Sequence, residues 1–113
     1  MYYLLDADRR KARGGTLYLE FQPGPYRNKH WQADSLYLPA PLFDDLGLYD
    51  LFRQAIPRFD YYYYTEVSPD QFRALAQLAQ EHHTQCAAQI LEELAPHAEN
   101  WLVEYGCFTI CGI

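Results

Sequence analysis

The sequence predicts an α+β fold: a mostly antiparallel sheet of four to five strands, with two main helices packed on one face. Three patterns predict this class: a strand-like alternation near the N-terminus, a long helical pattern after residue 68, and an apolar segment at the end of the sequence. The 113 residues suit a single domain, 1–113, that buries enough surface to fold without a metal or disulfide.

Two strands joined by a basic turn are predicted for the first 22 residues. Residues 2–6 read as a short first strand, and a glycine pair ends the basic turn that follows. Residues 16–22 alternate with a period of two. This alternation places Tyr18 and Glu20 on the face opposite Leu17, where they meet solvent.

A third strand and an interrupted helix are predicted next. Residues 31–38 favour a strand, and prolines follow it. Apolar residues then recur at helical spacing over 41–55, with a break near Gly47, and Pro57 stops the helix.

The tyrosine-rich segment 59–67 is the strongest strand prediction in the chain, because tyrosine has a high strand propensity. Its period of two separates two faces. The helix-facing set is Phe59, Tyr61, Tyr63 and Val67. The set assigned to solvent is Asp60, Tyr62, Tyr64 and Glu66. This assignment follows because one buried face cannot hold two unpaired carboxylates.

A long helix and a final strand complete the prediction. Ser68 and Gln71 match a capping box at the helix start, and the helical pattern continues to the residue before Pro96. Pro96 is expected to kink the helix or to start a second one. Gly106 suits a left-handed helix end, and the apolar segment 107–113 reads as an interior strand.

The charge balance narrows the classes of partner. Fifteen acids against nine bases give a formal net charge of −6 and a pI near 5.0. Nucleic-acid binding needs a basic face, so we expect no nucleic-acid partner, and the basic run 9–13 is interpreted as a solvated turn. We also expect no membrane segment and a cytoplasmic protein. An acidic surplus fits plain solubility, and it also fits a basic protein partner.

We expect no metal and no cofactor. Cys86, Cys107 and Cys111 form an odd set that suits buried hydrophobes in a reducing compartment. His82 and Cys86 lie four apart, but the spacing matches no closed zinc site, so no stoichiometric zinc is expected.

An enzyme is not expected either. The sequence has no phosphate-binding glycine loop, and thiols in an apolar strand are inert. The adjacent carboxylates at 44–45 and 92–93 point in different directions on a helix, so they favour solvated faces over an acid–base pair.

Tyrosine beside carboxylates is typical of a protein-binding surface, because the ring is rigid and apolar and its tip is polar. The structural alternative is that these tyrosines only contribute to packing against the sheet. The first candidate partner-binding set is Asp60, Tyr62, Tyr64, Glu66, Tyr18 and Glu20. The second set, on the first predicted helix, is Asp44, Asp45, Tyr49 and Asp50.

The C-terminal residues carry a resemblance. Leu91–Leu94, then Trp101, and then the segment Phe108-Thr109-Ile110-Cys111-Gly112-Ile113 are similar to the ending of small bacterial immunity proteins of polymorphic-toxin or contact-dependent growth-inhibition systems. In that family a helix with a tryptophan leads into a Phe-Thr-Ile-x-Gly-Ile strand. The resemblance implies a protein that binds and neutralises its cognate toxin, here a basic, nuclease-like one. It carries over no binding residue. The alternative is a generic protein-binding or regulatory domain, or a subunit of a homo-oligomer.

Overall fold

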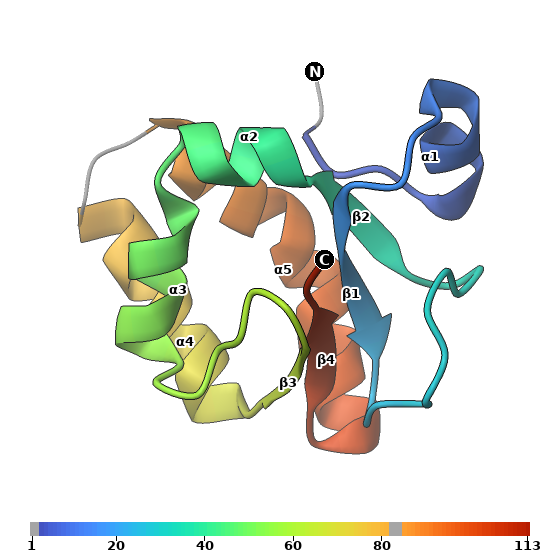
Figure 1. Ribbon diagram of the computed structural model, residues 1–113. Helices are drawn as coiled ribbons and strands as arrows, with labels where there is room; N and C mark the ends of the chain where they lie inside the picture. The colour runs from blue at the N-terminus through green and yellow to red at the C-terminus, as the bar shows by residue number, and fades with distance from the viewer. Residues whose placement is uncertain (1–2, 82–84) are drawn as a thin grey trace.

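The computed structural model describes residues 3–81 and 85–113, and these residues form the helices and strands labelled in Figure 1. In chain order the elements are α1 (Ala7–Arg13), β1 (Tyr18–Pro23), β2 (Leu36–Pro39), α2 (Ala40–Asp45), α3 (Leu48–Ala55), β3 (Tyr64–Val67), α4 (Pro69–Glu81), α5 (Gln85–Tyr105) and β4 (Phe108–Cys111). The strands form one antiparallel sheet in the order β2-β1-β4-β3. The predicted α+β class is confirmed, and β4 lies inside the sheet as expected.

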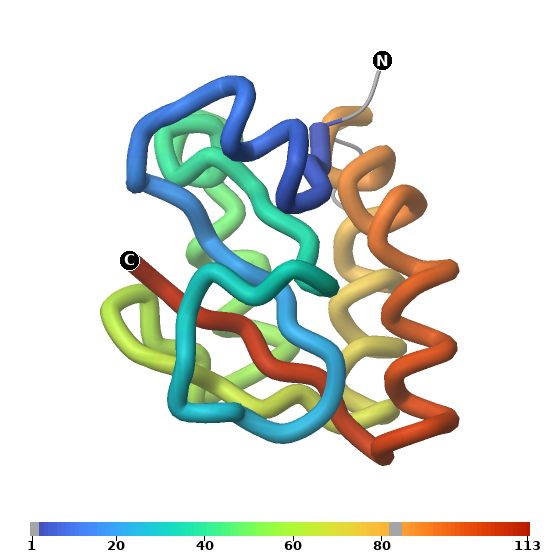
Figure 2. The backbone as a smooth tube through the Cα atoms, turned by 90° about the vertical axis from the view of Figure 1, so that its right-hand side faces the viewer, coloured from blue at the N-terminus to red at the C-terminus, as the bar shows by residue number. Residues whose placement is uncertain are grey.

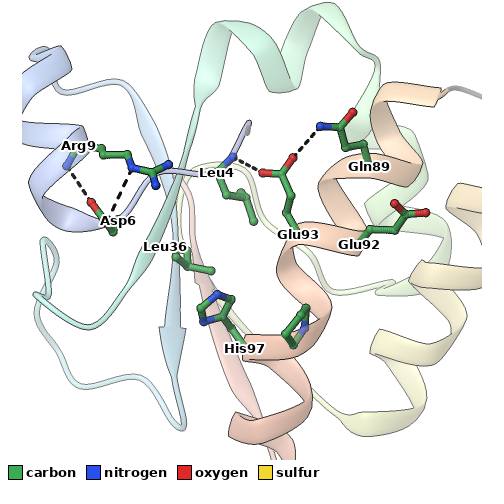
Figure 3. Close-up of a pocket in the computed structure, with 9 residues that line it drawn as sticks. Leu4, Asp6, Arg9, Leu36, Gln89, Glu92, Glu93 and His97 are labelled. Carbon is green, nitrogen blue, oxygen red and sulfur yellow. Dashed lines mark hydrogen bonds and ion pairs between the residues drawn. The ribbon is translucent and has the colours of Figure 1, made fainter. Parts of the chain in front are cut away.

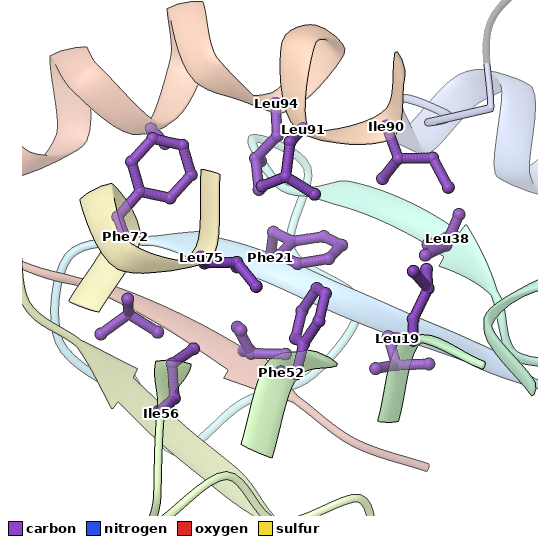
Figure 4. Packing of buried hydrophobic residues seen from close by; sticks show 14 of the residues in the cluster. Leu19, Phe21, Leu38, Phe52, Ile56, Phe72, Leu75, Ile90, Leu91 and Leu94 are labelled. Carbon is purple, nitrogen blue, oxygen red and sulfur yellow. The ribbon is translucent and has the colours of Figure 1, made fainter. Parts of the chain in front are cut away.

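The inner face of the sheet packs against the helices and forms the main hydrophobic core (Figure 4). β1 contributes Leu19 and Phe21 to this core, and β4 contributes Phe108 and Ile110. In Figure 4, Phe21 faces Leu94 of α5. Full burial of each such side chain stabilises the fold by roughly 1.5–3 kcal/mol.

Several predicted local signals are confirmed. The Ser68 Oγ accepts a hydrogen bond from the Gln71 N–H (3.2 Å), and the Gln71 Oε1 accepts one from the Ser68 N–H (3.0 Å), which completes the capping box of α4. Gly47 separates α2 from α3 with a φ of 65°, and Gly106 ends α5 with a φ of 78°. Trp101 is buried, as expected for the face of α5 that meets β4.

The long helical region differs from the prediction at Pro96, where no kink or new helix begins. The described part of α4 ends at Glu81, and α5 then runs through Pro96 without a break. Residues 82–84 between them lie outside the described residues. α5 survives the hydrogen bond lost at Pro96 because Leu94 and Ala98, on either side of it, are both fully buried.

The N-terminal prediction of a strand and a basic turn is wrong. Leu5 makes only an isolated bridge to Tyr37, and the basic run forms α1. The Asp6 carboxylate caps this helix by accepting a hydrogen bond from the Arg9 N–H (2.8 Å). The basic residues then fall in its last turn, where the helix dipole favours positive charge.

The second and third strands are shifted from their predicted ranges. β1 begins at Tyr18, so Leu17 lies outside it and is 56% exposed. β2 covers Leu36–Pro39 rather than 31–38. Trp31 has a φ of +63°, which is a left-handed conformation and not that of an extended strand. The predicted strand therefore cannot begin at Trp31.

The tyrosine-rich strand is shorter than predicted: β3 covers only Tyr64–Val67, and residues 59–63 form turns. The Asp60 carboxylate accepts a hydrogen bond from the Tyr62 N–H (2.9 Å), a side-chain turn that competes with strand pairing. The predicted separation of faces is confirmed for Phe59, which is buried, and for Asp60 and Tyr62, which are exposed, but it fails at Tyr63. Tyr63, assigned to the helix-facing set, is 62% exposed.

Candidate protein-binding surface

Residues 24–35, the covering segment, lie over the outer face of the sheet, on the side opposite α4 and α5 (Figure 2). The strand register puts Glu20 opposite Cys111 and Cys111 opposite Tyr64. Glu20 and Tyr64 therefore share this face, as predicted. Their expected exposure is wrong for β1: Tyr18 is 4% exposed and Glu20 is 3% exposed, because the covering segment shields them.

The Glu20 carboxylate holds the covering segment in place. Its Oε1 accepts a hydrogen bond from the Trp31 N–H (2.8 Å). Its Oε2 accepts from the Gln32 N–H (2.9 Å), the Ser35 hydroxyl (2.7 Å) and the Tyr37 hydroxyl (3.4 Å). A buried carboxylate is tolerated when its oxygens are bonded in this way. Glu20 is therefore a structural residue and not a partner-binding one.

Tyr18 is also part of the covered face. Its ring packs edge-on against Trp31 (6.2 Å between centroids) and Tyr37 (6.3 Å). The Arg10 guanidinium lies 4.6 Å from the Trp31 centroid and 4.8 Å from the Tyr37 centroid. Arg10 is thus half-buried on aromatic rings, and the basic run is more than the solvated turn predicted for it.

Tyr64 and Glu66 stand at the edge of the covered face. The Tyr26 ring stacks on Tyr64 with 4.0 Å between centroids and 14° between planes. The Glu66 Oε2 accepts a hydrogen bond from the Tyr26 N–H (3.0 Å). Glu66 is exposed and Tyr64 is half-buried, but both already bind the covering segment.

The remaining candidates gather on a second surface, formed by α2, α3 and the turns at 59–63. We call it the tyrosine–aspartate surface. Direct contacts join Asp44, Tyr49, Tyr61 and Tyr62, and the surface also includes their exposed neighbours along the chain, Asp45, Asp50 and Asp60. It joins the second predicted set to part of the first. All of these residues are exposed except Tyr61, which is half-buried. The side chains of Asp45 and Asp50 make no hydrogen bond or ion pair with the described residues.

Tyr61 links the two parts of this surface. Its hydroxyl donates a hydrogen bond to the Asp44 Oδ2 (3.1 Å). Its ring lies 6.3 Å from the Tyr49 ring and 5.2 Å from the Tyr62 ring, nearly perpendicular to both. Burial and the Asp44 hydrogen bond raise the pKa of Tyr61 to about 12, so the phenol stays neutral at physiological pH.

The segment after β4 fixes the position of Tyr61. The Gly112 N–H donates to the Tyr63 carbonyl oxygen (2.7 Å), and the Ile113 N–H donates to the Tyr61 carbonyl oxygen (2.8 Å). A Cβ at Gly112 would lie 1.9 Å from that carbonyl oxygen, so only glycine fits this approach. That Gly112 and Ile113 hold the tyrosine turn was not predicted from the sequence. A glycine after an apolar strand is nevertheless a signal of close backbone approach.

A cavity of about 670 Å³ lies between the N-terminal segment and α5 (Figure 3). Its polar groups are mostly occupied. The Glu93 Oε1 accepts hydrogen bonds from the Tyr3 N–H (2.8 Å) and the Leu4 N–H (2.9 Å), and the Gln89 side chain donates to Glu93 Oε2 (3.2 Å). These bonds attach the N-terminal segment to α5, so we assign the cavity walls a structural role.

Glu20, His30 and Cys111 bring potential metal-ligand atoms within 4.8 Å of one another. The sequence spacing gave no signal of this cluster. Its chemistry favours a structural role, because both Glu20 oxygens already accept hydrogen bonds. Burial and the Glu20 charge raise the pKa of Cys111 to about 12, so its thiol is held protonated. His82, whose spacing from Cys86 was expected to form no closed zinc site, lies outside the described residues.

The chain matches no protein-family model, no curated protein and no solved structure. Within residues 3–81 and 85–113, no helix has the length and apolar character to cross a membrane.

Proposed function

We propose that the chain is an immunity protein that neutralises a basic, nuclease-like toxin domain by binding it through the tyrosine–aspartate surface. The observation that carries this proposal is the exposed position of the acids and tyrosines on that surface. Asp45 and Asp50 have no partner among the described residues, and they flank Asp44 and Tyr49. Elsewhere in the fold, by contrast, Glu20 is buried and bonded.

Charge and ring chemistry both support a basic protein partner. The surface has four acids, and the neighbouring exposed bases are Arg53 and Arg58. Arg53 is already engaged, because it donates to the Tyr49 hydroxyl (3.4 Å) and to the Phe59 carbonyl oxygen (3.2 Å). Proteins that bind nucleic acid present basic faces, so an acidic surface attracts them and speeds association.

The C-terminal resemblance supports the immunity role in a second way. The residues that carry it, Phe108 to Ile113, include the backbone groups that hold Tyr61 and Tyr63. The segment that is similar to the ending of immunity proteins therefore forms part of the framework of the proposed binding surface.

Co-expression with the products of the neighbouring genes tests the proposal, which expects one of them to be a toxin. We expect the wild-type chain to restore growth. Asp45→Lys combined with Asp50→Lys should weaken toxin binding by about tenfold or more, because attraction and steering both reverse sign. The association rate of the wild type should fall as salt rises.

The matched control is Glu99→Lys combined with Glu104→Lys on α5, which changes the net charge equally at exposed positions away from α2 and α3. We expect this control to bind like the wild type. Equal loss in both variants would mean that net charge alone steers binding. A chain that fails to restore growth beside any neighbouring toxin would favour the alternative, a generic protein-binding or regulatory domain.

A further inference from the structure

The tyrosine–aspartate surface contains a cavity of about 400 Å³ that is lined by Asp44, Tyr49, Tyr61 and Tyr62. Three aromatic side chains and one carboxylate thus line the same open depression. The ring planes of Tyr49 and Tyr62 stand at 75° and 89° to that of Tyr61. The three rings therefore border the cavity in different orientations.

We propose that this cavity binds an arginine side chain of a partner protein, which rests on the surface assigned under the proposed function. Aromatic faces attract a cation through the ring quadrupole. A planar guanidinium can also stack on a ring while it donates to a carboxylate, which a lysine ammonium cannot do in the same way.

Asp44 supplies the carboxylate for this arrangement. Its Oδ2 accepts the Tyr61 hydroxyl, which fixes the carboxylate at the wall of the cavity. Among the described residues, its Oδ1 has no hydrogen-bond partner. The bound carboxylate therefore keeps one oxygen for a charged donor, and charged donors form the stronger hydrogen bonds.

The chain already uses the same chemistry within its own fold. The Arg10 guanidinium lies on the Trp31 and Tyr37 rings at 4.6 and 4.8 Å. Arg53 lies 6.0 Å from the Tyr49 centroid, where its two hydrogen bonds hold it beside the cavity. Arg53 opposes a second cation, but the four surface acids outweigh it and Arg58.

Titration of the full chain with N-acetyl-arginine amide, followed by NMR of its tyrosine rings, tests this proposal. N-acetyl-citrulline amide is the neutral isostere, and N-acetyl-lysine amide carries the same charge. We expect saturable shifts at Tyr49, Tyr61 and Tyr62 with the arginine compound, weaker shifts with lysine, and none with citrulline.

Two variants locate the binding. Asp44→Asn and Tyr62→Ala should each lower the affinity for the arginine compound about tenfold. Tyr63→Ala is the matched control. Tyr63 is the neighbouring tyrosine and is 62% exposed, but it does not line the cavity. Circular dichroism checks that each variant is folded.

The proposal is overturned by the absence of saturable shifts, by equal shifts with citrulline, or by variants that bind like the wild type. Because the assay uses no toxin, its outcome is separate from that of the co-expression experiment. Arginine binding without toxin neutralisation would retain the cavity and reject the immunity role. Toxin neutralisation without arginine binding would retain the immunity role and reject the arginine site in the cavity.

Discussion

The covered outer face of the sheet and the tyrosine–aspartate surface have similar compositions but opposite environments. In the first, Glu20 accepts two backbone N–H groups and two hydroxyls and is buried with Tyr37. In the second, Asp44 accepts one tyrosine hydroxyl and remains exposed beside Tyr61. A carboxylate surrounded by backbone donors stabilises the fold, whereas one without them remains available to a partner.

The largest effect is expected from neutralising the buried carboxylate. Glu20→Gln keeps the shape but places an amide group against donors, and loses charge-assisted hydrogen bonds that contribute about 1.5–3 kcal/mol each. We expect the free energy of unfolding to fall by about 3 kcal/mol in urea denaturation. Asp45→Asn, the counterpart on the exposed surface, should leave it unchanged. Equal effects at the two sites would remove the distinction between the regions.

A smaller effect is expected where the framework meets the exposed surface. Gly112→Ala forces a Cβ against the Tyr61 carbonyl oxygen, so residues 60–63 must move. Such overpacking costs roughly 1–3 kcal/mol. We expect altered amide shifts at Tyr61 to Tyr63 and weaker partner binding. Ile113→Ala keeps the backbone N–H and is the control. Wild-type shifts in Gly112→Ala would show that this contact does not position the surface.

The smallest effect is expected at alkaline pH. Burial, then the charge of Glu20, raises the pKa of Tyr37 from 10.0 to about 12, and Tyr61 is raised to a similar value. The unfolded chain then loses its phenolic protons first. This stabilisation is fully present below pH 10 and is lost as the pH rises towards 12.

Chemical denaturation between pH 8 and 12 of the wild type, Tyr37→Phe and Tyr61→Phe measures this decline. Each variant should show a shallower decline than the wild type, and Tyr37→Phe the shallowest, because Tyr37 is fully buried. Cys111, whose pKa is raised in the same direction, contributes equally in all three proteins. A wild-type slope in Tyr37→Phe would contradict the buried role of this hydroxyl.

Hydrophobic periodicity predicted the fold class because the residues of the core recur with the period of the strand or helix that carries them. Leu19, Phe21, Phe108 and Ile110 alternate along β1 and β4, and the α4 residues recur at helical spacing. The N-terminal helix was missed because a short basic segment has little apolar pattern, and its stability depends on the Asp6 cap and on Arg10 packing against rings.

The candidate site was predicted in part. The strand period correctly grouped Glu20 with Tyr64 on one face, but it carries no information on what covers that face. The covering segment is irregular, and among its residues with positive φ, Trp31 is of a type that gives no turn signal in the sequence. Asp44 and Tyr49 were predicted on one helix and Tyr61 on a strand, and only the tertiary fold brings Tyr61 into contact with both.

The hydrogen bonds that tie Gly112 and Ile113 to the tyrosine turns have a consequence for specificity. Both run between backbone groups, so they hold the turn whatever side chains it carries. Tyr62 and Tyr63, exposed by 76% and 62%, bear no core contact that a substitution would remove. The scaffold therefore separates shape from recognition. A combinatorial library at these two positions should yield new specificities on an unchanged fold.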